Sequence, residues 1–302
     1  MAKKKRKRAG SKGRTPRGII FIGITLLIGG IALLKVLPKP GEHIKPYYQA
    51  KPPATLSPTK ITPQKKELPP LPPPLPKTAP ARIAILIDDL GIDEAAAQSL
   101  LQMDFPLTLS ILPSLPHSLT IARLAKKHHR EVLLHLPMEP HGYSRNKLYP
   151  DILLTDMDEQ TLLKKTRACL EQIPDIIGVN NHMGSKFTEY PDKMRPVLKV
   201  LKEQGLFFID SRTSKDSVAY RLAKAMGLRA NQRQIFLDNN QTEEAIIKQI
   251  MALGRLAKST NGRKGVIAIA HPHPSTISAL SKTLPKLKTS GIEIVPVSYL
   301  LD

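Results

Sequence analysis

From residue 82 to the C-terminus, short runs of apolar residues alternate with longer amphipathic stretches. This alternation is typical of βα units, in which each strand of a parallel sheet is followed by a helix that covers it. The apolar runs predict strands over residues 82–87, 107–112, 131–134, 176–179, 206–209, 234–237, 266–270 and 292–297. The amphipathic stretches predict helices over residues 94–103, 119–128, 159–173, 193–204, 217–226 and 242–256.

Seven or eight such strands favour an α/β fold with a single (β/α) barrel, distorted or incomplete. The alternative is a doubly wound open sheet, in which a Gly-rich turn after the first strand often binds phosphate. Asp88 and Asp89 stand at that position instead. The sequence therefore predicts one barrel domain over residues 81–302.

The first 37 residues have the composition of a basic targeting segment followed by a membrane anchor. Residues 1–17 carry nine Lys or Arg and no acid, and residues 18–37 are apolar except for Lys35. A helix needs about 17–25 apolar residues to span a bilayer, and positive flanks stay in the cytoplasm. We expect a cytoplasmic basic tail over 1–17 and a retained transmembrane signal anchor over 18–37. A cleaved signal peptide is the alternative, but Leu-Lys-Val-Leu-Pro is a poor cleavage site.

Residues 38–80 contain 14 of the 28 prolines of the chain. A segment of this composition forms a semi-rigid, polyproline-rich linker and no hydrophobic core. We expect this linker to hold the barrel domain in the periplasm or another extracytoplasmic space. The chain is then a single-pass protein of the cytoplasmic (inner) membrane, with its N-terminus inside.

Most of the formal net charge of +21 precedes the predicted domain, because residues 38–80 add seven Lys against two Glu. A nucleic-acid-binding protein places its basic excess on the folded domain, and aromatic side chains for base stacking are scarce here. We therefore expect no nucleic-acid partner. The single cysteine, Cys169, excludes an intramolecular disulfide and is expected to face the core.

Polar side chains stand where most of the predicted strands end. In a barrel of parallel strands these ends converge on one face. Unpaired carboxylates are costly to bury, and a divalent cation relieves that cost. Asp210 and Asp238 have a simpler interpretation as helix caps, which is preferred for Asp238. The residues at the strand ends are Asp88, Asp89, His135, Asn180, Asn181, His182, Asp210, Ser211, Asp238, His271 and His273.

These residues offer oxygen and nitrogen donors and no thiolate. Such a set suits Zn²⁺ with an open coordination position, and Ni, Co, Mn and Fe remain open. Taken together, the strand-end residues predict a divalent-metal site.

The motifs around these residues resemble those of the divergent polysaccharide deacetylases, relatives of the carbohydrate esterases with a NodB-like fold. The resemblance covers residues 81–302. The matching segments are Ile-Asp-Asp-Leu-Gly at 87–91, Leu-His-Leu-Pro-Met-Glu-Pro at 134–140, Gly-Val-Asn-Asn-His-Met-Gly-Ser at 178–185, Phe-Ile-Asp-Ser at 208–211 and Ile-Ala-Ile-Ala-His at 267–271.

The resemblance implies a role for each matching residue. Asp88 corresponds to the catalytic base, Asp89 and His135 to metal ligands, and His271 to the general acid. Asp210 corresponds to an acid that orients other catalytic groups.

Three departures from the family pattern leave the ligand set open. Glu139 stands in place of a second histidine, an expected arginine is missing, and His182 appears where typical members have none. The metal is held either by Asp89, His135 and His182, with Glu139 supporting one of them, or by Asp89, His135 and Glu139. The first set is preferred. Asn180, Asn181 and Ser185 are candidates for oxyanion or substrate contacts.

The function that this resemblance implies is metal-dependent hydrolysis of acetyl groups on an envelope polysaccharide or peptidoglycan sugar. The alternative is a catalytically inactive deacetylase-like domain that binds an envelope glycan or a protein partner. A third hypothesis is a glycosidase that uses the carboxylates of Asp88 and Glu139 without a metal.

Overall fold

The computed structural model describes residues 80–144 and 149–301, and nine strands of this part of the chain form one sheet. The strands are parallel in the order β6-β5-β4-β3-β2-β1-β8-β7, and β9 pairs with the first residues of β1. Their bounds are β1 Ala81–Leu90, β2 Thr108–Ile111, β3 Val132–Met138, β4 Gly178–Met183, β5 Phe207–Asp210, β6 Ala230–Gln232, β7 Ile235–Phe236, β8 Val266–Ala270 and β9 Ile292–Ile294.

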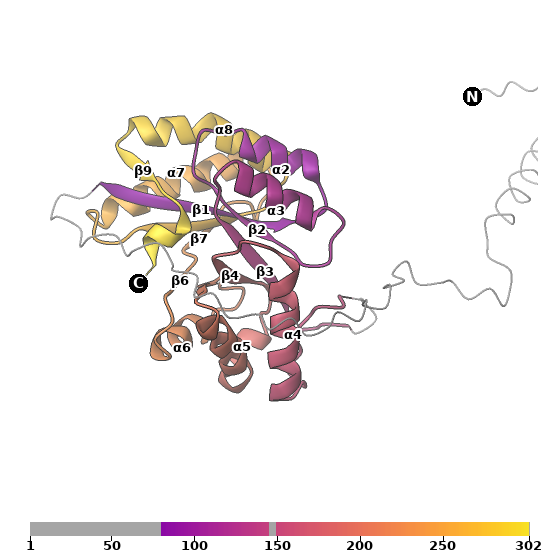
Figure 1. Ribbon diagram of the computed structural model, residues 1–302. Helices are drawn as coiled ribbons and strands as arrows, with labels where there is room; N and C mark the ends of the chain where they lie inside the picture. Colours follow the sequence, from indigo (N-terminus) through magenta and orange to yellow (C-terminus); the bar gives the residue numbers. More distant parts are fainter. Residues whose placement is uncertain (1–79, 145–148, 302) are drawn as a thin grey trace, which may run out of the picture. The chain divides into compact units, whose positions relative to one another are not determined.

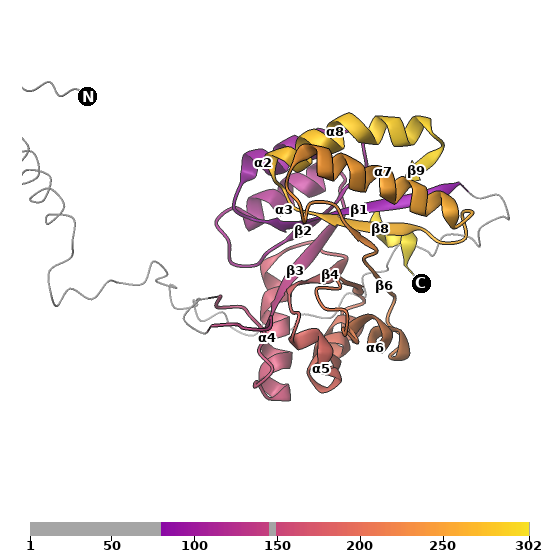
Figure 2. The ribbon, with the colours of Figure 1, turned by 180° about the vertical axis from the view of Figure 1, so that it is seen from behind.

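Helices alternate with the strands and cover the outer face of the curled sheet (Figures 1 and 2). Contacts between α7 and α8, α2 and α8, α2 and α3, α4 and α5, and α5 and α6 link them side by side. The helices are α2 Glu94–Leu101, α3 Ser118–Lys127, α4 Glu159–Gln172, α5 Pro191–Glu203, α6 Ala219–Ala225, α7 Glu243–Ser259 and α8 Pro274–Thr289, with short 3₁₀ turns at η1 Phe187–Glu189 and η2 Val297–Leu300.

The expected incomplete α/β barrel is confirmed, because the sheet curls but its end strands β6 and β7 are not paired with each other among the described residues. Two elements were not predicted. β6 is three residues long and contains two polar amides, so it lacks an apolar run. α8 begins with Pro274 and contains Pro285, and proline inside a helix normally argues against one.

Successive residues of each strand face two different layers. In β1, Ile83, Ile85 and Ile87 pack toward the helices, while Ala84 and Leu86 face the inside of the curl. Both layers are apolar in β1, β5 and β8, so these strands read as continuous hydrophobic runs. Cys169 is buried in the helix-facing layer, as expected.

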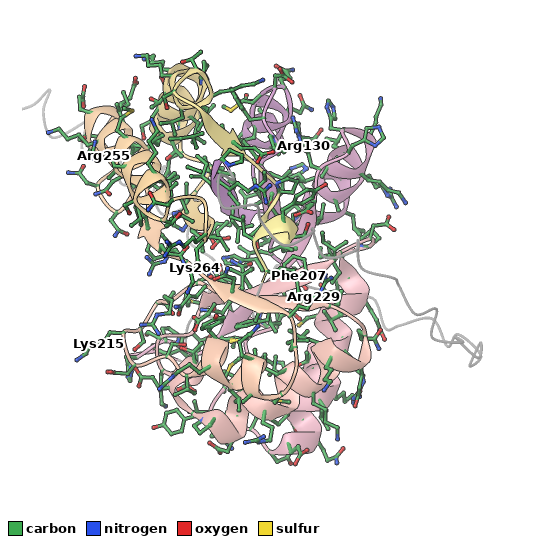
Figure 3. All side chains as sticks on the ribbon, turned by 90° about the vertical axis from the view of Figure 1, so that its left-hand side faces the viewer. Arg130, Phe207, Lys215, Arg229, Arg255 and Lys264 are labelled. Carbon is green, nitrogen blue, oxygen red and sulfur yellow. The ribbon has the colours of Figure 1, made fainter. Side chains whose placement is uncertain are left out.

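The C-terminal turn η2 closes the inside of the curl at the amino ends of the strands. Val297 and Leu300 join the inner layer with Phe207 (labelled in Figure 3). Val297 N donates to Thr108 Oγ1 (3.0 Å), and Ser298 N donates to Glu131 Oε2 (3.2 Å). The amino end of the sheet is therefore filled, and the carboxyl ends remain for a site.

The expected tail 1–17, anchor 18–37 and linker 38–80 lie outside the described residues, except for Pro80. Over 80–144 and 149–301, no helix has the length and apolarity needed to cross a bilayer. Basic side chains such as Lys215, Arg255 and Lys264 project from the domain surface at separate places (Figure 3).

Candidate metal centre

The two consecutive aspartates at the end of β1 reach the same site because the strand is irregular there. Adjacent side chains of a regular strand point to opposite faces. The pairing of β1 with β2 shifts register between Ile87 and Leu90, and Asp89 has φ of 58°. This bulge adds one residue and redirects the strand, and a left-handed non-glycine residue is a strained feature typical of functional sites. Both carboxylates can therefore face the inside of the curl.

Asp89, His135 and His182 bring three ligand atoms together at the carboxyl ends of β1, β3 and β4. Asp89 Oδ1 lies 3.0 Å from His135 Nε2 and 2.8 Å from His182 Nδ1, and the two nitrogens are 3.2 Å apart. Each pair of atoms is thus close enough to share one bound ion. This is the first of the two ligand sets that the sequence left open, and these three residues form the metal triad.

The donor set of the metal triad fits a divalent cation. Oδ1 of Asp89 is buried and accepts no hydrogen bond among the described residues, despite the two short contacts. Ligand atoms at 2.0–2.1 Å from a tetrahedral zinc ion lie about 3.3 Å from one another, close to the observed spacing. Burial would raise the pKa of Asp89, but His135 and His182 hold it well below its usual range, so the carboxylate is ionised. One carboxylate and two imidazoles leave a tetrahedral ion one open position.

Asp88 is buried beside the metal triad, and its surroundings suit a proton acceptor. Its Oδ2 lies 3.5 Å from His135 Nε2, and its Oδ1 accepts a hydrogen bond from Asn180 Nδ2 (2.9 Å). Burial raises the pKa of Asp88 to about 6; the charge of Asp89 adds to the rise and that of His135 opposes it. A carboxylate with a raised pKa is a better base than a solvated one.

His271 faces the metal triad from the end of β8. Its Nε2 lies 3.8 Å from Asp89 Oδ2, and its Nδ1 lies 3.0 Å from Asp238 Oδ1. Burial lowers the pKa of His271, but the bond and charge of Asp238, with the charges of Asp89 and Asp88, raise it to about 9. The imidazole is therefore protonated at neutral pH and can donate a proton.

Asp238 positions His271. The interpretation of Asp238 as a helix cap is therefore wrong. Asp238 Oδ2 accepts hydrogen bonds from His271 N (2.6 Å) and Thr276 Oγ1 (3.0 Å). The cap of α7 is Thr242, and Asp238 takes no part in it. Asp238 lies two residues after Phe236, which packs against the inner layer, so both side chains point to the inside of the curl. His273 groups with this pair, but Asp238 is already engaged by His271 and Thr276.

Asp210 makes no hydrogen bond or ion pair with His271 among the described residues, and its partners lie in the loop after β5 and at the start of α6. Asp210 lies two residues after Phe208, so its side chain points to the same side of β5, toward the helices. Its Oδ2 accepts hydrogen bonds from Ser217 Oγ (2.7 Å) and Tyr220 N (3.2 Å), and its Oδ1 accepts from Arg212 N (2.8 Å). Asp210 therefore fastens the loop that leads into α6.

The three candidate oxyanion contacts have other partners. Asn180 donates to Asp88 and to Ser211 Oγ (3.0 Å), so both of its amide protons are used. The side chain of Asn181 points to the other side of β4 from that of Asn180, and it donates to Met183 O (2.8 Å). Ser185 Oγ accepts from the backbone N of His141 (3.0 Å).

Glu139 also lies apart from the metal triad. Its Oε2 accepts from the N and Oγ1 of Thr155 (both 2.6 Å), and its Oε1 pairs with Lys186 Nζ (2.7 Å). The second ligand set is therefore not assembled, and Glu139 supports the loops beside the site. One neighbour was not predicted: the ring of Tyr149 lies 5.7 Å from that of His182.

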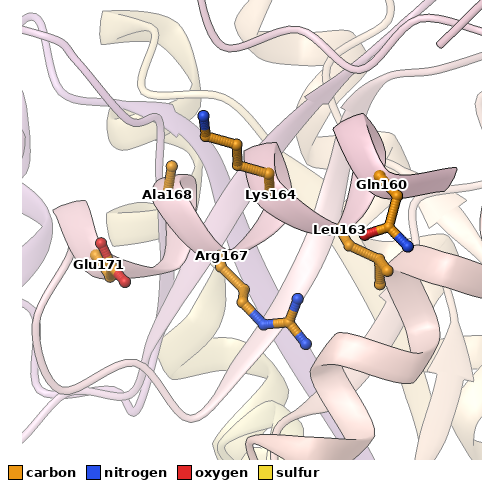
Figure 4. A pocket seen from close by; sticks show the side chains of 6 residues that line it. All are labelled: Gln160, Leu163, Lys164, Arg167, Ala168 and Glu171. Carbon is orange, nitrogen blue, oxygen red and sulfur yellow. The ribbon is translucent and has the colours of Figure 1, made fainter. Parts of the chain in front are cut away.

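A separate hollow of about 400 Å³ lies on the outer face of α4 (Figure 4). No residue of the metal triad lines it. The lining residues are Gln160, Leu163, Lys164, Arg167, Ala168 and Glu171.

Comparisons with known proteins agree with this fold. An uncharacterized protein of Agrobacterium tumefaciens C58, ATU2773, has a crystal structure with a TM-score of 0.69 and 28% identity, covering 74% of this chain and 89% of that one. The uncharacterized protein YibQ of Escherichia coli (strain K12) is 34% identical over 221 residues, or 73% of this chain and 67% of YibQ. An uncharacterized protein of Haemophilus influenzae is 34% identical over 209 residues, or 69% and 73% of the two chains.

A family model also matches most of the described domain. The model described as divergent polysaccharide deacetylase matches residues 85–301. That range begins just before Asp88 and ends after η2. This chain therefore belongs to the divergent polysaccharide deacetylase family.

Proposed function

We propose that this protein is a metal-dependent hydrolase that removes acetyl groups from a polysaccharide or peptidoglycan sugar of the cell envelope. The observation that carries the proposal is the metal triad, in which Asp89 Oδ1 is buried without a hydrogen bond between two imidazole nitrogens at 2.8 and 3.0 Å. A buried anionic oxygen without donors is costly unless a cation binds it. Zn²⁺ is the metal that this donor set favours.

When bound, the cation supplies Lewis-acid chemistry, polarising an acyl carbonyl and acidifying water. Asp88, buried and with a pKa of about 6, takes the proton of the attacking water. The water oxygen bonds to the acetyl carbon, and the bond from that carbon to the sugar nitrogen or oxygen breaks. His271, protonated and held by Asp238, gives its proton to the departing atom. The products are acetate and a free amino or hydroxyl group.

The expected location follows from the N-terminal sequence and is part of the proposal. The basic tail over 1–17 and the apolar stretch over 18–37 anchor the chain in the inner membrane with its N-terminus inside. The domain then acts in the periplasm or another extracytoplasmic space, where envelope glycans are accessible.

The test is metal analysis of the purified full-length chain together with an acetate-release assay on acetylated glycans. Wild type is expected to bind one equivalent of zinc and to release acetate. His135→Ala is expected to lose both, because it removes one of three ligands. The matched control is His128→Ala, which changes an exposed histidine at the end of α3 and is expected to keep both.

Each other outcome points elsewhere. Stoichiometric metal without acetate release from any acetylated glycan would favour a domain that binds glycans or a protein partner. A wild-type chain that binds no divalent metal would overturn the proposal.

A further inference from the structure

The side-chain amide of Asn180 connects the proton acceptor to the metal triad. Its Nδ2 donates to Asp88 Oδ1 (2.9 Å), and its Oδ1 lies 3.0 Å from His135 Nδ1. The side chain is completely buried. Two hydroxyl groups from other parts of the sheet hold it: Ser110 Oγ of β2 donates to Oδ1, and Ser211 Oγ, directly after β5, accepts from Nδ2 (3.0 Å). The amide is thus held by one residue of β2 and one residue that follows β5.

The orientation of this amide determines which nitrogen of His135 carries a proton. An ionised carboxylate only accepts hydrogen bonds, so the amide nitrogen faces Asp88 and the carbonyl oxygen faces His135. The carbonyl oxygen also only accepts, so His135 Nδ1 carries the proton. When the ring is neutral, His135 Nε2 then has its lone pair, and it is the nitrogen that lies 3.0 Å from Asp89 Oδ1.

We propose that Asn180 is a positioning residue of this site, which keeps the proton of His135 on Nδ1 and thereby presents Nε2 to a divalent cation. The same amide holds Asp88 beside that ligand. The inference rests on the proposed function for the identity of the bound group. It gives Asn180 a role different from an oxyanion contact, because both of its amide protons are already used. Partners of this kind commonly orient metal-binding histidines, and their loss costs about 10–100-fold in metal affinity or activity.

Two substitutions in the full-length chain separate the two contacts of the amide. Asn180→Leu keeps a similar volume but removes the acceptor for His135 and the donor to Asp88. We expect its Kd for zinc to rise by about 10–100-fold. Asn180→Asp keeps an oxygen facing His135 but places a second oxygen against Asp88. We expect its Kd for zinc to stay near that of the wild type while its rate of acetate release falls.

Nitrogen-15 NMR of the histidine side chains provides a readout that does not depend on activity. In the wild type and in Asn180→Asp, His135 Nδ1 is expected to carry its proton with zinc bound and, without zinc, at a pH high enough for the ring to be neutral. In zinc-free Asn180→Leu at that pH, the signals are expected to show a mixture of the two tautomers. Asn231→Leu is the matched control, because it removes a buried asparagine that bonds Leu300 and no residue of the site.

The outcomes separate this inference from the proposed function. If folded Asn180→Leu binds zinc as tightly as the wild type, with unchanged His135 nitrogen signals, the positioning role is overturned. If the wild type releases no acetate, the zinc affinities and the tautomer still decide the inference. If the wild type binds no zinc, the proposed function fails, and the tautomer in the metal-free chain, at a pH high enough for the His135 ring to be neutral, still shows whether Asn180 holds the Nδ1 proton.

Discussion

Each end of the curled sheet holds a carboxylate that is partly shielded from water, and the two have different partners. At the amino end, Glu131 accepts hydrogen bonds from Ser298 N (3.2 Å), Ser298 Oγ and Thr108 Oγ1 (3.3 Å). At the carboxyl end, Asp89 Oδ1 accepts no hydrogen bond among the described residues and faces two imidazole nitrogens.

The comparison separates a structural carboxylate from a binding one. A shielded carboxylate needs donors or a cation, because desolvation of the charge is costly. Glu131 obtains its donors from the C-terminal turn that closes the fold, so it needs nothing further. Asp89 stands in a strained backbone conformation with φ of 58°, and its buried Oδ1 faces two imidazole nitrogens. In the proposed function, a bound cation takes the place of such donors.

The largest effect is expected from Asp89→Asn, which removes the negative charge of the metal triad. Zinc at about 100 times its Kd stabilises a one-site protein by about 2.7 kcal/mol, or about 5–10 °C in Tm for a domain of this size. We expect the wild type to show this shift and Asp89→Asn to show none, with acetate release also lost. Thermal unfolding with and without zinc measures it.

Glu131→Gln is the matched control for that experiment, since it neutralises the carboxylate at the other end of the sheet. It is expected to keep the full zinc-dependent shift. Equal shifts in Asp89→Asn and the wild type would show that the two carboxylates do not differ in the way proposed.

A smaller effect is expected from Asp238→Asn, which leaves the metal triad intact. The amide oxygen still accepts from His271 N and Thr276, so the amide nitrogen is directed at His271 Nδ1 and removes its acceptor. The imidazolium loses its counter-charge, and we expect kcat to fall by roughly 100-fold. Zinc affinity and KM should stay near the wild-type values.

Asp210→Asn tests whether the loss of kcat is specific to Asp238 or follows from replacing any buried aspartate near the strand ends. Asp210 contacts the loop before α6 and not His271. Its substitution is expected to lower the free energy of unfolding, while the folded fraction keeps its kcat. A loss of kcat in Asp210→Asn equal to that in Asp238→Asn would contradict the assignment.

The alternation of strands and helices and the ends of the strands could be predicted from the sequence, because both depend on local composition. Asp88, Asp89, His135, His182 and His271 were all expected at one face, and the structure brings them together. What could not be predicted was which side of each strand a polar residue faces. The strands β1, β3, β5 and β8 carry apolar residues on both sides, so their pattern does not show which side faces the helices.

This ambiguity explains the two residues whose roles were reversed. Asp210 points to the same side as Phe208, toward the helices. Asp238 points to the same side as Phe236, toward the inside of the curl. Asn180 and Asn181 differ in the same way. The bulge that redirects Asp89 is also a tertiary feature, since it appears only in the pairing of β1 with β2.

The smallest expected effect is a pH dependence of stability at the amino end of the sheet. Burial raises the pKa of Glu131, and the hydrogen bonds of Ser298 and Thr108 oppose the rise only in part. The folded chain therefore holds this proton more tightly than the unfolded chain does, so the contribution of Glu131 to stability falls as pH rises above about 4.5. Glu131→Gln removes that titration. Between pH 5 and pH 7, the free energy of unfolding should therefore decrease less in Glu131→Gln than in the wild type. Ser298→Ala removes a group that lowers this pKa and should make the loss larger. Denaturant unfolding at the two pH values measures both, and a steeper loss in Glu131→Gln than in the wild type would show that the hydrogen bonds outweigh burial.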